Sequence, residues 1–301
     1  MEKIVIGTRG SDLALWQAHY VQDLLQSQGF ESELNIIKTK GDIIQHLSFD
    51  KMEGKGFFTK EIESALIDGE CDLAIHSFKD LETSDPEGLE VVCMPQRTIP
   101  NDILIIRKCV GEIKAISDIP IGAIIGTSSA RRKNQWRAIH PNSELKDLRG
   151  NVPTRIQKLR DENYDAIILA AAGVDRLQLD LSEFTVLNLQ NFDFVPAPAQ
   201  GALGVQIRAN DQRLRDILTP VHDRDNWVCV KLERSVLAWM NGGCHVPLGV
   251  HVQKREGTIQ LEVSYATEEL GPRTLAKFES QSTDQLFKQA TALIDQCRSK
   301  S

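Results

Sequence analysis

Two segments of the sequence carry side chains that could take part in catalysis. The first, His76-Ser-Phe-Lys79-Asp80, comes directly after the apolar run Leu73-Ala-Ile75. An α/β protein presents side chains to its ligand where a buried strand ends, and a carboxylate at Asp80 would steer protons or stabilise a cation there. Taken alone, Lys79 and Asp80 can also be interpreted as solvated loop charges.

The second segment is centred on Cys244, which follows Gly242 and Gly243 and precedes His245. Glycines allow close approach of backbone and ligand, and a thiolate is a good nucleophile. Adjacent residues rarely align as a thiolate and imidazole pair, so a structural cysteine is the alternative interpretation. The 6 cysteines are scattered without a C-x-x-C pair, which indicates neither a disulfide framework nor a metal site.

Positive charge is concentrated in residues 131–160 of an acidic chain. The net charge of the whole sequence is -7, whereas this window holds nine basic and two acidic residues. Guanidinium groups bind carboxylate or phosphate through paired hydrogen bonds, so the window predicts a polyanionic small ligand. A solvated helix face is the alternative. The acidic remainder argues against nucleic acid as a general partner, and no segment is apolar enough for a membrane span.

The spacing of apolar residues predicts the elements that position these groups. At 301 residues, the chain suits two or three domains of roughly 100 residues each. Ser11 can cap a helix, and alternating strands and helices follow it, which is α/β architecture. The expected elements of the first domain are strands at residues 4–7, 34–38 and 73–75 and helices at 12–28 and 62–69.

Part of this pattern occurs twice. The turn Ile6-Gly7-Thr8 corresponds to Ile125-Gly126-Thr127, and residues 68–75 correspond to 161–168, so we infer two similar α/β domains. Each turn leads into a helix start where backbone N–H groups and the helix dipole favour anions, and a ligand is expected in a cleft between the domains. The hydroxyl residues at these starts are Thr8, Ser11, Thr127, Ser128 and Ser129.

The last third of the chain has a different pattern. The Pro-rich stretch 195–201 is expected to cross between domains. A helix at 226–240, alternating strands joined by a Glu256-Gly257 turn, and a final helix at 283–297 indicate a small α+β domain.

Eight motifs in order closely resemble the hydroxymethylbilane synthase (porphobilinogen deaminase) family, from the first strand to about Gly249. They are Thr8-Arg9-Gly-Ser11 with Leu13-Ala-Leu-Trp16, Gly54-Lys55-Gly with Phe58, His76-Ser-Phe-Lys-Asp80, Gly126-Thr-Ser-Ser-Ala-Arg-Arg132, Leu148-Arg-Gly-Asn-Val-Pro-Thr-Arg155, Ala172-Gly-Val-Asp-Arg176, Gln200-Gly-Ala-Leu203 and Gly242-Gly-Cys-His-Val-Pro-Leu248.

The resemblance implies two α/β domains like those of type II periplasmic binding proteins, with a cleft between them, and a small C-terminal α+β domain. We assign residues 1–98 and 196–214 to domain 1, 99–195 to domain 2 and 215–301 to domain 3. It also implies a dipyrromethane cofactor joined by a thioether to Cys244. Four porphobilinogen molecules would be added to this cofactor, each with loss of ammonia, before water releases the linear tetrapyrrole hydroxymethylbilane.

Residue roles follow from the same resemblance. Asp80 corresponds to the catalytic aspartate, Lys79 to its neighbouring lysine, and Lys55 and Phe58 to a mobile active-site loop. Each pyrrole brings two carboxylates, which gives the basic window a reason, and no metal is implied. The residues expected to bind cofactor and substrate are Arg9, Ser11, Lys55, Phe58, Thr127, Ser128, Ser129, Arg131, Arg132, Arg149, Arg155, Arg176 and Gln200.

Three positions depart from the usual family pattern. Asp12 replaces a common Pro at the first helical position, where an acid is also favourable. Glu82 stands where Pro often follows the catalytic segment, and Ala199 stands where Gly often precedes Gln-Gly. These two changes put the rigidity of the Asp80 loop and of the hinge in question, rather than the reaction.

Two other classes of protein compete with this assignment. A non-enzymatic, two-lobed anion-binding protein would be expected to carry an export signal and would not need Cys244. A phosphate-binding transferase using Lys55 would need the G-x-x-x-x-G-K-[ST] spacing, which is absent. We therefore expect a cytoplasmic monomer that binds porphobilinogen, without nucleic acid or membrane partners. It can hand its product to uroporphyrinogen-III synthase, as the resemblance implies.

Replacing Cys244 by Ser is expected to abolish stable cofactor attachment. A serine hydroxyl without an adjacent base is a far weaker nucleophile than a cysteine thiolate. Intact-mass measurement of the purified protein checks this, because the wild type should carry a mass excess equal to a dipyrrole. A Cys244→Ser protein that is fully active without that mass excess would refute the attachment site.

Overall fold

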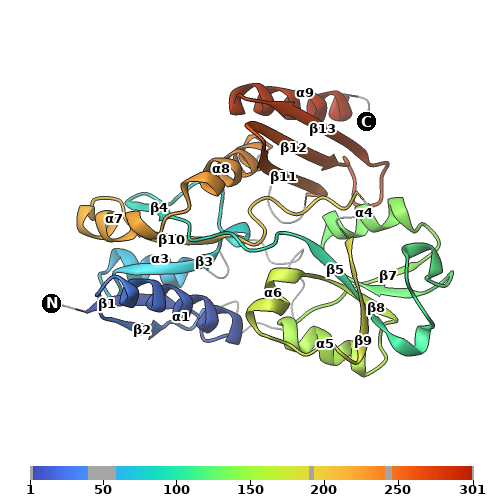
Figure 1. The fold of residues 1–301 in the computed structure, drawn as a ribbon, viewed down its shortest axis with the longest axis horizontal. Helices are drawn as coiled ribbons and strands as arrows, with labels where there is room; N and C mark the ends of the chain where they lie inside the picture. Colours follow the sequence, from blue (N-terminus) through green and yellow to red (C-terminus); the bar gives the residue numbers. More distant parts are fainter. Residues whose placement is uncertain (1–2, 40–58, 190–192, 241–245, 300–301) are drawn as a thin grey trace. The chain divides into compact units, whose positions relative to one another are not determined.

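The computed structural model describes residues 3–39, 59–189, 193–240 and 246–299 (Figure 1). The chain divides into two compact units, one of residues 1–98 and 201–227 and the other of residues 99–200 and 228–301. None of the helices in the described residues has the length and apolar composition needed to span a bilayer. The expected α/β class is confirmed by two five-stranded mixed sheets, to which a three-stranded antiparallel sheet is added.

The first unit is built on a sheet of order β2-β1-β3-β10-β4. β1, β2 and β3 run parallel, whereas β10 is antiparallel to both of its neighbours, β3 and β4. Its core includes apolar side chains from the sheet and from α1. The elements are β1 (Ile4–Thr8), α1 (Asp12–Ser27), β2 (Ser32–Ile36), α3 (Lys60–Ile67), β3 (Leu73–Ser77), β4 (Leu89–Cys93), β10 (Leu203–Arg208) and α7 (Gln212–Leu218).

The sequence predicts most of the first unit correctly. Ser11 caps α1, and its hydroxyl accepts a hydrogen bond from the backbone N–H of Ala14 at 3.4 Å. The strand expected at 34–38 lies at Ser32–Ile36, because its pairing with β1 begins opposite Ile4. Half-buried polar side chains along β2 give this edge strand a weak apolar signal.

The second unit repeats the same arrangement. Its sheet has the order β7-β6-β8-β5-β9, with β6, β7 and β8 parallel and β5 antiparallel to both β8 and β9. The inferred duplication of α/β architecture is therefore confirmed. The elements are β5 (Asp102–Arg107), β6 (Ile124–Gly126), α4 (Ala130–Ile139), β7 (Glu144–Lys146), α5 (Val152–Arg160), β8 (Ala166–Ala170), α6 (Ala171–Arg176) and β9 (Phe184–Asn188).

The duplication extends to single hydrogen bonds. Asp72 accepts the backbone N–H of Val5 through its carboxylate at 2.8 Å, and its own N–H donates to the Val5 carbonyl at 2.8 Å. Asp165 makes the same pair with Ile124, at 2.8 Å and 2.9 Å. Each aspartate therefore fixes the start of a central strand relative to the next strand of its sheet.

Each of the two Ile-Gly-Thr turns needs glycine, because neighbouring side chains leave no space for a Cβ atom. A Cβ on Gly7 would lie 2.7 Å from the sulfur of Cys71, and one on Gly126 would lie 2.8 Å from the ring of Tyr164. Cβ atoms do not approach other atoms so closely, so any larger residue would push the strand from its neighbour. The strand ends that lead into α1 and α4 are thereby held in equivalent positions within their sheets.

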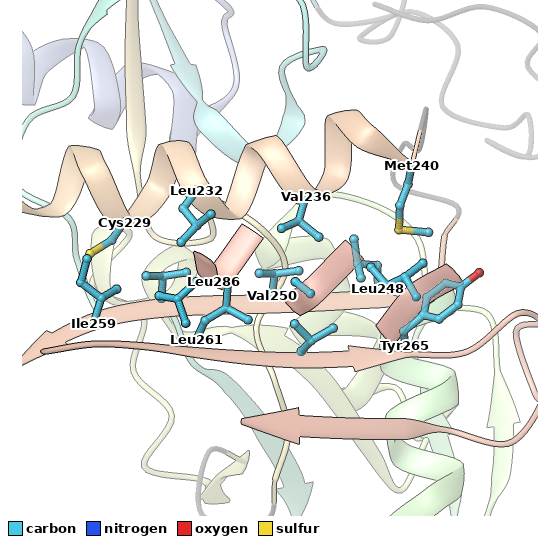
Figure 2. Close-up of a cluster of buried hydrophobic side chains, with 14 residues drawn as sticks. Cys229, Leu232, Val236, Met240, Leu248, Val250, Ile259, Leu261, Tyr265 and Leu286 are labelled. Carbon is cyan, nitrogen blue, oxygen red and sulfur yellow. The ribbon is translucent and has the colours of Figure 1, made fainter. Parts of the chain in front are cut away.

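The C-terminal part of the second unit is a three-stranded sheet with two helices. α8 and α9 contribute apolar side chains to one core with β11 and β12. Figure 2 shows Leu232 and Val236 of α8, and Met240 directly after the helix, directed toward the strands. Glu256 and Gly257 both have positive φ at the predicted turn between β11 and β12. The elements are α8 (Arg224–Trp239), β11 (Leu248–Arg255), β12 (Thr258–Tyr265), β13 (Thr274–Ser280) and α9 (Thr283–Ser299).

Candidate functional site

Asp80 lies where the buried strand β3 ends, as the sequence predicts. β3 passes into a single 3-10 turn, η2 (Phe78–Asp80), in which Phe78 is buried, Lys79 is half-buried and Asp80 is exposed. The N–H of Phe78 donates to the carbonyl of Ala202 at 3.1 Å, which ties the turn to the segment leading into β10. The turn thus presents the Asp80 carboxylate to solvent from a fixed backbone.

Buried polar groups lie beside this turn. His76 is 6% exposed, and burial, together with the charge of Arg9, lowers its pKa to about 4. Burial is the largest cause of a raised pKa at Glu63, and the side chain of Gln206 opposes the effect of burial on the pKa of both Glu63 and His76. His76 is therefore neutral at physiological pH. Arg9, a predicted binding residue, lies close enough to His76 to affect its titration.

In the second unit, Arg131 and Arg132 converge on the buried carboxylate of Asp102. Arg131 Nη1 donates to Asp102 Oδ2 at 2.7 Å, and Arg132 donates to Oδ1 from Nε at 2.9 Å and from Nη2 at 2.7 Å. The side chain of Asp102 is 0% exposed, and those of the arginines are 4% and 8% exposed. The solvated-face interpretation is therefore wrong for these two arginines.

The electrostatics of this cluster favour a further anion. Burial alone would raise the pKa of Asp102, but the charges of Arg131 and Arg132 hold it well below its usual range. Burial lowers the pKa of Arg131. One carboxylate balances only one of two guanidinium charges, and an uncompensated buried charge is unfavourable. Gln200 completes the cluster by donating from Nε2 to Asp102 Oδ1 at 3.1 Å.

The predicted hydroxyl residues order the start of α4. Ser129 caps the helix and accepts the N–H of Arg132 at 3.5 Å, and Thr127 Oγ1 accepts the N–H of Ser129 at 3.3 Å. Ser128 bonds Leu148 twice, donating to its carbonyl and accepting its N–H at 3.0 Å each. Its hydroxyl hydrogen is thus used within the protein, whereas Ser129 acts as an acceptor.

Three further predicted arginines lie on or beside helices of the second unit. Arg149 is half-buried before α5, and its carbonyl accepts from Lys158 Nζ at 3.0 Å. Arg155 on α5 donates from Nε to the Gly150 carbonyl at 2.7 Å. Arg176 ends α6 and is 6% exposed. The structure thus groups Arg131, Arg132 and Gln200 around one carboxylate, whereas Arg149, Arg155 and Arg176 lie on or beside α5 and α6.

The remaining predicted site residues, Lys55, Phe58 and Cys244, lie outside the described residues. Within the described ranges, no group of three or more His, Cys, Asp or Glu side chains is arranged to hold a metal ion.

Two buried carboxylates were not predicted from the sequence. Asp102 begins the otherwise apolar strand β5, and a charged residue in that place signals a buried partner. Glu233 of α8 is 0% exposed and accepts the N–H groups of Ala199 at 2.7 Å and Val252 at 2.8 Å. Ala199 has a φ of 61°, a left-handed conformation that favours glycine and explains why Gly is common there.

The fold and these side chains define a class of protein: a duplicated α/β protein with buried arginines suited to an organic polyanion. Residues 4–216 match the family described as "Porphobilinogen deaminase, dipyromethane cofactor binding domain", and residues 227–282 match "Porphobilinogen deaminase, C-terminal domain". The chain belongs to the porphobilinogen deaminase family. It is therefore a transferase with hydroxymethylbilane synthase activity in tetrapyrrole biosynthesis, and its cofactor is a dipyrromethane.

Similar proteins include porphobilinogen deaminases from several bacteria. The protein of Maridesulfovibrio salexigens is 44% identical over 263 residues, which is 87% of this chain and 83% of the relative. That of Clostridioides difficile is 42% identical over 270 residues, or 88% of this chain and 87% of the relative. Among solved structures, the second substrate binding domain of a putative amino acid ABC transporter from Streptococcus pneumoniae has a TM-score of 0.45 at 12% identity, covering 80% of this chain and 95% of that chain.

Replacing Asp102 by Asn is expected to lower the free energy of unfolding by about 3 to 5 kcal/mol, because it leaves two buried guanidinium groups without their counter-charge. Urea unfolding measures this. Glu112→Gln is the control, since Glu112 pairs with Lys114 at 81% exposure and such pairs contribute little. Equal stabilities of the Asp102→Asn protein and wild type would contradict the charge-balance interpretation.

His76 is expected to make stability depend on pH between about 6.5 and 4. Its pKa is about 4 in the folded chain and 6.5 when exposed, so the unfolded chain takes up the proton first and stability falls as pH decreases through this range. Over the whole range, the free energy of unfolding is expected to fall by about 3 kcal/mol. His76→Gln should flatten this part of the unfolding profile, whereas His19→Gln, at an exposed position, should not. An unchanged profile in His76→Gln would argue against a neutral buried His76.

Proposed function

We propose that Asp80 and Lys79 are the catalytic side chains of this transferase and that Cys244 carries its dipyrromethane. The observation that most directly supports a carboxylate-bearing ligand is the buried pair of guanidinium groups over one carboxylate at Asp102. Such a cluster has spare positive charge, and the donors in it are suited to carboxylates. The acetate and propionate groups of pyrrole units supply carboxylates in the number that this basic region needs.

The donor set of the second unit fits the cofactor. Arg131, Arg132 and Gln200 would hold carboxylates of the dipyrromethane close to Asp102, and Arg149 and Arg155 would extend the same positive region. When bound, the dipyrromethane would supply the free pyrrole carbon to which the first porphobilinogen is joined. Fixed guanidinium donors orient such a ligand without reorganisation during the reaction, which lowers the barrier to coupling.

Asp80 acts by electrostatic stabilisation in this proposal. Loss of ammonia from porphobilinogen leaves a delocalised cation, and an ionised carboxylate near its ring N–H favours that state over the neutral substrate. Exposure of Asp80 at the end of β3 allows a substrate to reach it. Lys79, the preceding residue of the turn, balances the charge of the Asp80 carboxylate and meets substrate carboxylates.

Binding of the incoming substrate is assigned to the helix starts and the remaining arginines. Ser11 accepts only a weak capping bond, at 3.4 Å, and its hydroxyl hydrogen can be donated to a carboxylate. Thr127 and Ser129 shape the equivalent start of α4, and Ser128 holds the following loop. Arg9, Arg176, Lys55 and Phe58 complete the proposed set.

The wider organisation of the protein is also a proposal. The three domains would comprise residues 1–98 and 196–214, 99–195 and 215–301. We propose that the enzyme is a cytoplasmic monomer and that its product passes to uroporphyrinogen-III synthase, as the family resemblance implies. Binding of the purified synthase to the loaded enzyme during turnover, measured by co-sedimentation, tests the hand-off.

Asp80→Asn is expected to lower the rate of coupling by orders of magnitude, while leaving the fold and substrate binding largely intact. Asn keeps the shape of Asp but lacks the charge that stabilises the cation. Asp80→Glu keeps the charge and displaces it by one methylene, so it should retain more activity than Asn. Single-turnover assays with cofactor occupancy checked by mass measure both. A fully loaded Asp80→Asn enzyme that is as fast as wild type would show that Asp80 is not the catalytic group.

A further inference from the structure

The position of the Asp80 turn depends on one buried aromatic ring. Phe78 is the buried residue of η2, and Lys79 and Asp80 follow it in the same turn. The ring of Phe78 packs over Gly204 of β10, where a Cβ would lie 3.2 Å from ring carbon Cδ2. Because η2 is only three residues long, the seating of Phe78 sets the direction in which the next two side chains leave the sheet.

Trp227, in the first turn of α8, contacts Phe78. The two rings are stacked, with centroids 5.8 Å apart and an interplanar angle of 16°. Stacked aromatic pairs stabilise their own geometry beyond the contribution of the buried area. The indole therefore restricts the movement of Phe78 away from the sheet.

The start of α8 is itself tied to the first sheet. His222 meets the Trp227 ring edge-on at a centroid distance of 5.0 Å, and its Nδ1 accepts the N–H of Met94 at 3.1 Å. The N–H of Asp223 donates to the Met94 carbonyl at 2.8 Å, and Trp227 N–H donates to the Asp223 carbonyl at 2.9 Å. Burial lowers the pKa of His222, which keeps Nδ1 available as an acceptor. The backbone of Trp227 is thus tied to the first sheet, and its ring contacts those of both Phe78 and His222.

We propose that Trp227 is a positioning residue for Asp80, acting through Phe78. The inference rests on the proposed role of Asp80. Trp227 lies in the first turn of α8. The helix runs on to Trp239, and Cys244 follows in the sequence. The helix that supports the carboxylate is the one that leads to the proposed attachment cysteine.

The first test compares Trp227→Ala, Trp227→Phe and Tyr20→Ala as fully loaded enzymes, well below their melting temperatures. Tyr20 stacks on Trp16 in the same unit with centroids 5.5 Å apart and is the matched control for loss of an aromatic pair. We expect Trp227→Ala to lower kcat by about 10- to 100-fold, the effect of a small displacement of a catalytic group, with little change in KM. Trp227→Phe should recover most of the rate, and Tyr20→Ala should keep it.

If Trp227→Ala does not fold, Trp227→Leu replaces it, because leucine fills part of the same volume without a flat ring to stack. Wild-type kcat in either variant overturns the proposal. An equal decrease in Tyr20→Ala also overturns it, because the decrease would then follow from general loss of stability.

The second test places Trp227→Ala in an Asp80→Asn background. If Trp227 acts through the carboxylate, the double variant should be as slow as Asp80→Asn alone, because the group being positioned is already lost. Effects that multiply would show that Trp227 acts elsewhere and would overturn the inference. If Asp80→Asn alone is as fast as wild type, the proposed role of Asp80 fails, and the positioning role fails with it for a distinguishable reason.

Discussion

Balance of buried charge at Asp102 is the constraint on which the second unit depends. Three segments far apart in sequence, at the starts of β5 and α4 and at Gln200, meet at this one carboxylate. A carboxylate in such a place is stable only when cations and hydrogen-bond donors surround it. Because two guanidinium groups face it, the cluster has positive charge to spare, and the proposed carboxylate site depends on the same atoms that hold the fold together.

The duplicated turns explain why both units offer the same kind of binding element. Gly7 and Gly126 lie against large neighbours, and Asp72 and Asp165 fix the adjoining strands with matching hydrogen bonds. In each sheet these contacts deliver a helix start at the carboxyl end of a central strand, where backbone donors and arginines gather. In both units, a glycine at the strand end thus allows the strand to pack closely against a large neighbouring side chain.

Much of the fold could be predicted from local sequence patterns. Contacts between residues that are distant in the sequence could not be predicted. The Ser11 cap, the turn at Glu256 and Gly257 and the exposed position of Asp80 follow from short-range signals. Neither the pairing of Asp102 with two arginines nor the antiparallel placement of β10 has a signature in its own segment. The arginine-rich window indicated an anion site, but its composition could not show which arginines are buried, since burial depends on residues about 30 positions earlier.

The interior position of β10 in its sheet has a consequence for the order in which the two sheets can form during synthesis. This strand lies between β3 and β4, yet it begins at Leu203, after every strand of the second sheet. A ribosome therefore releases the complete set of strands β5 to β9 while the sheet of the first unit still lacks the strand that joins β3 to β4. Domains form as units once their strands are available, so the C-terminal half of the duplication can be native first. The N-terminal strands, although synthesised earliest, must wait with open edges, and their apolar surfaces need protection during that interval.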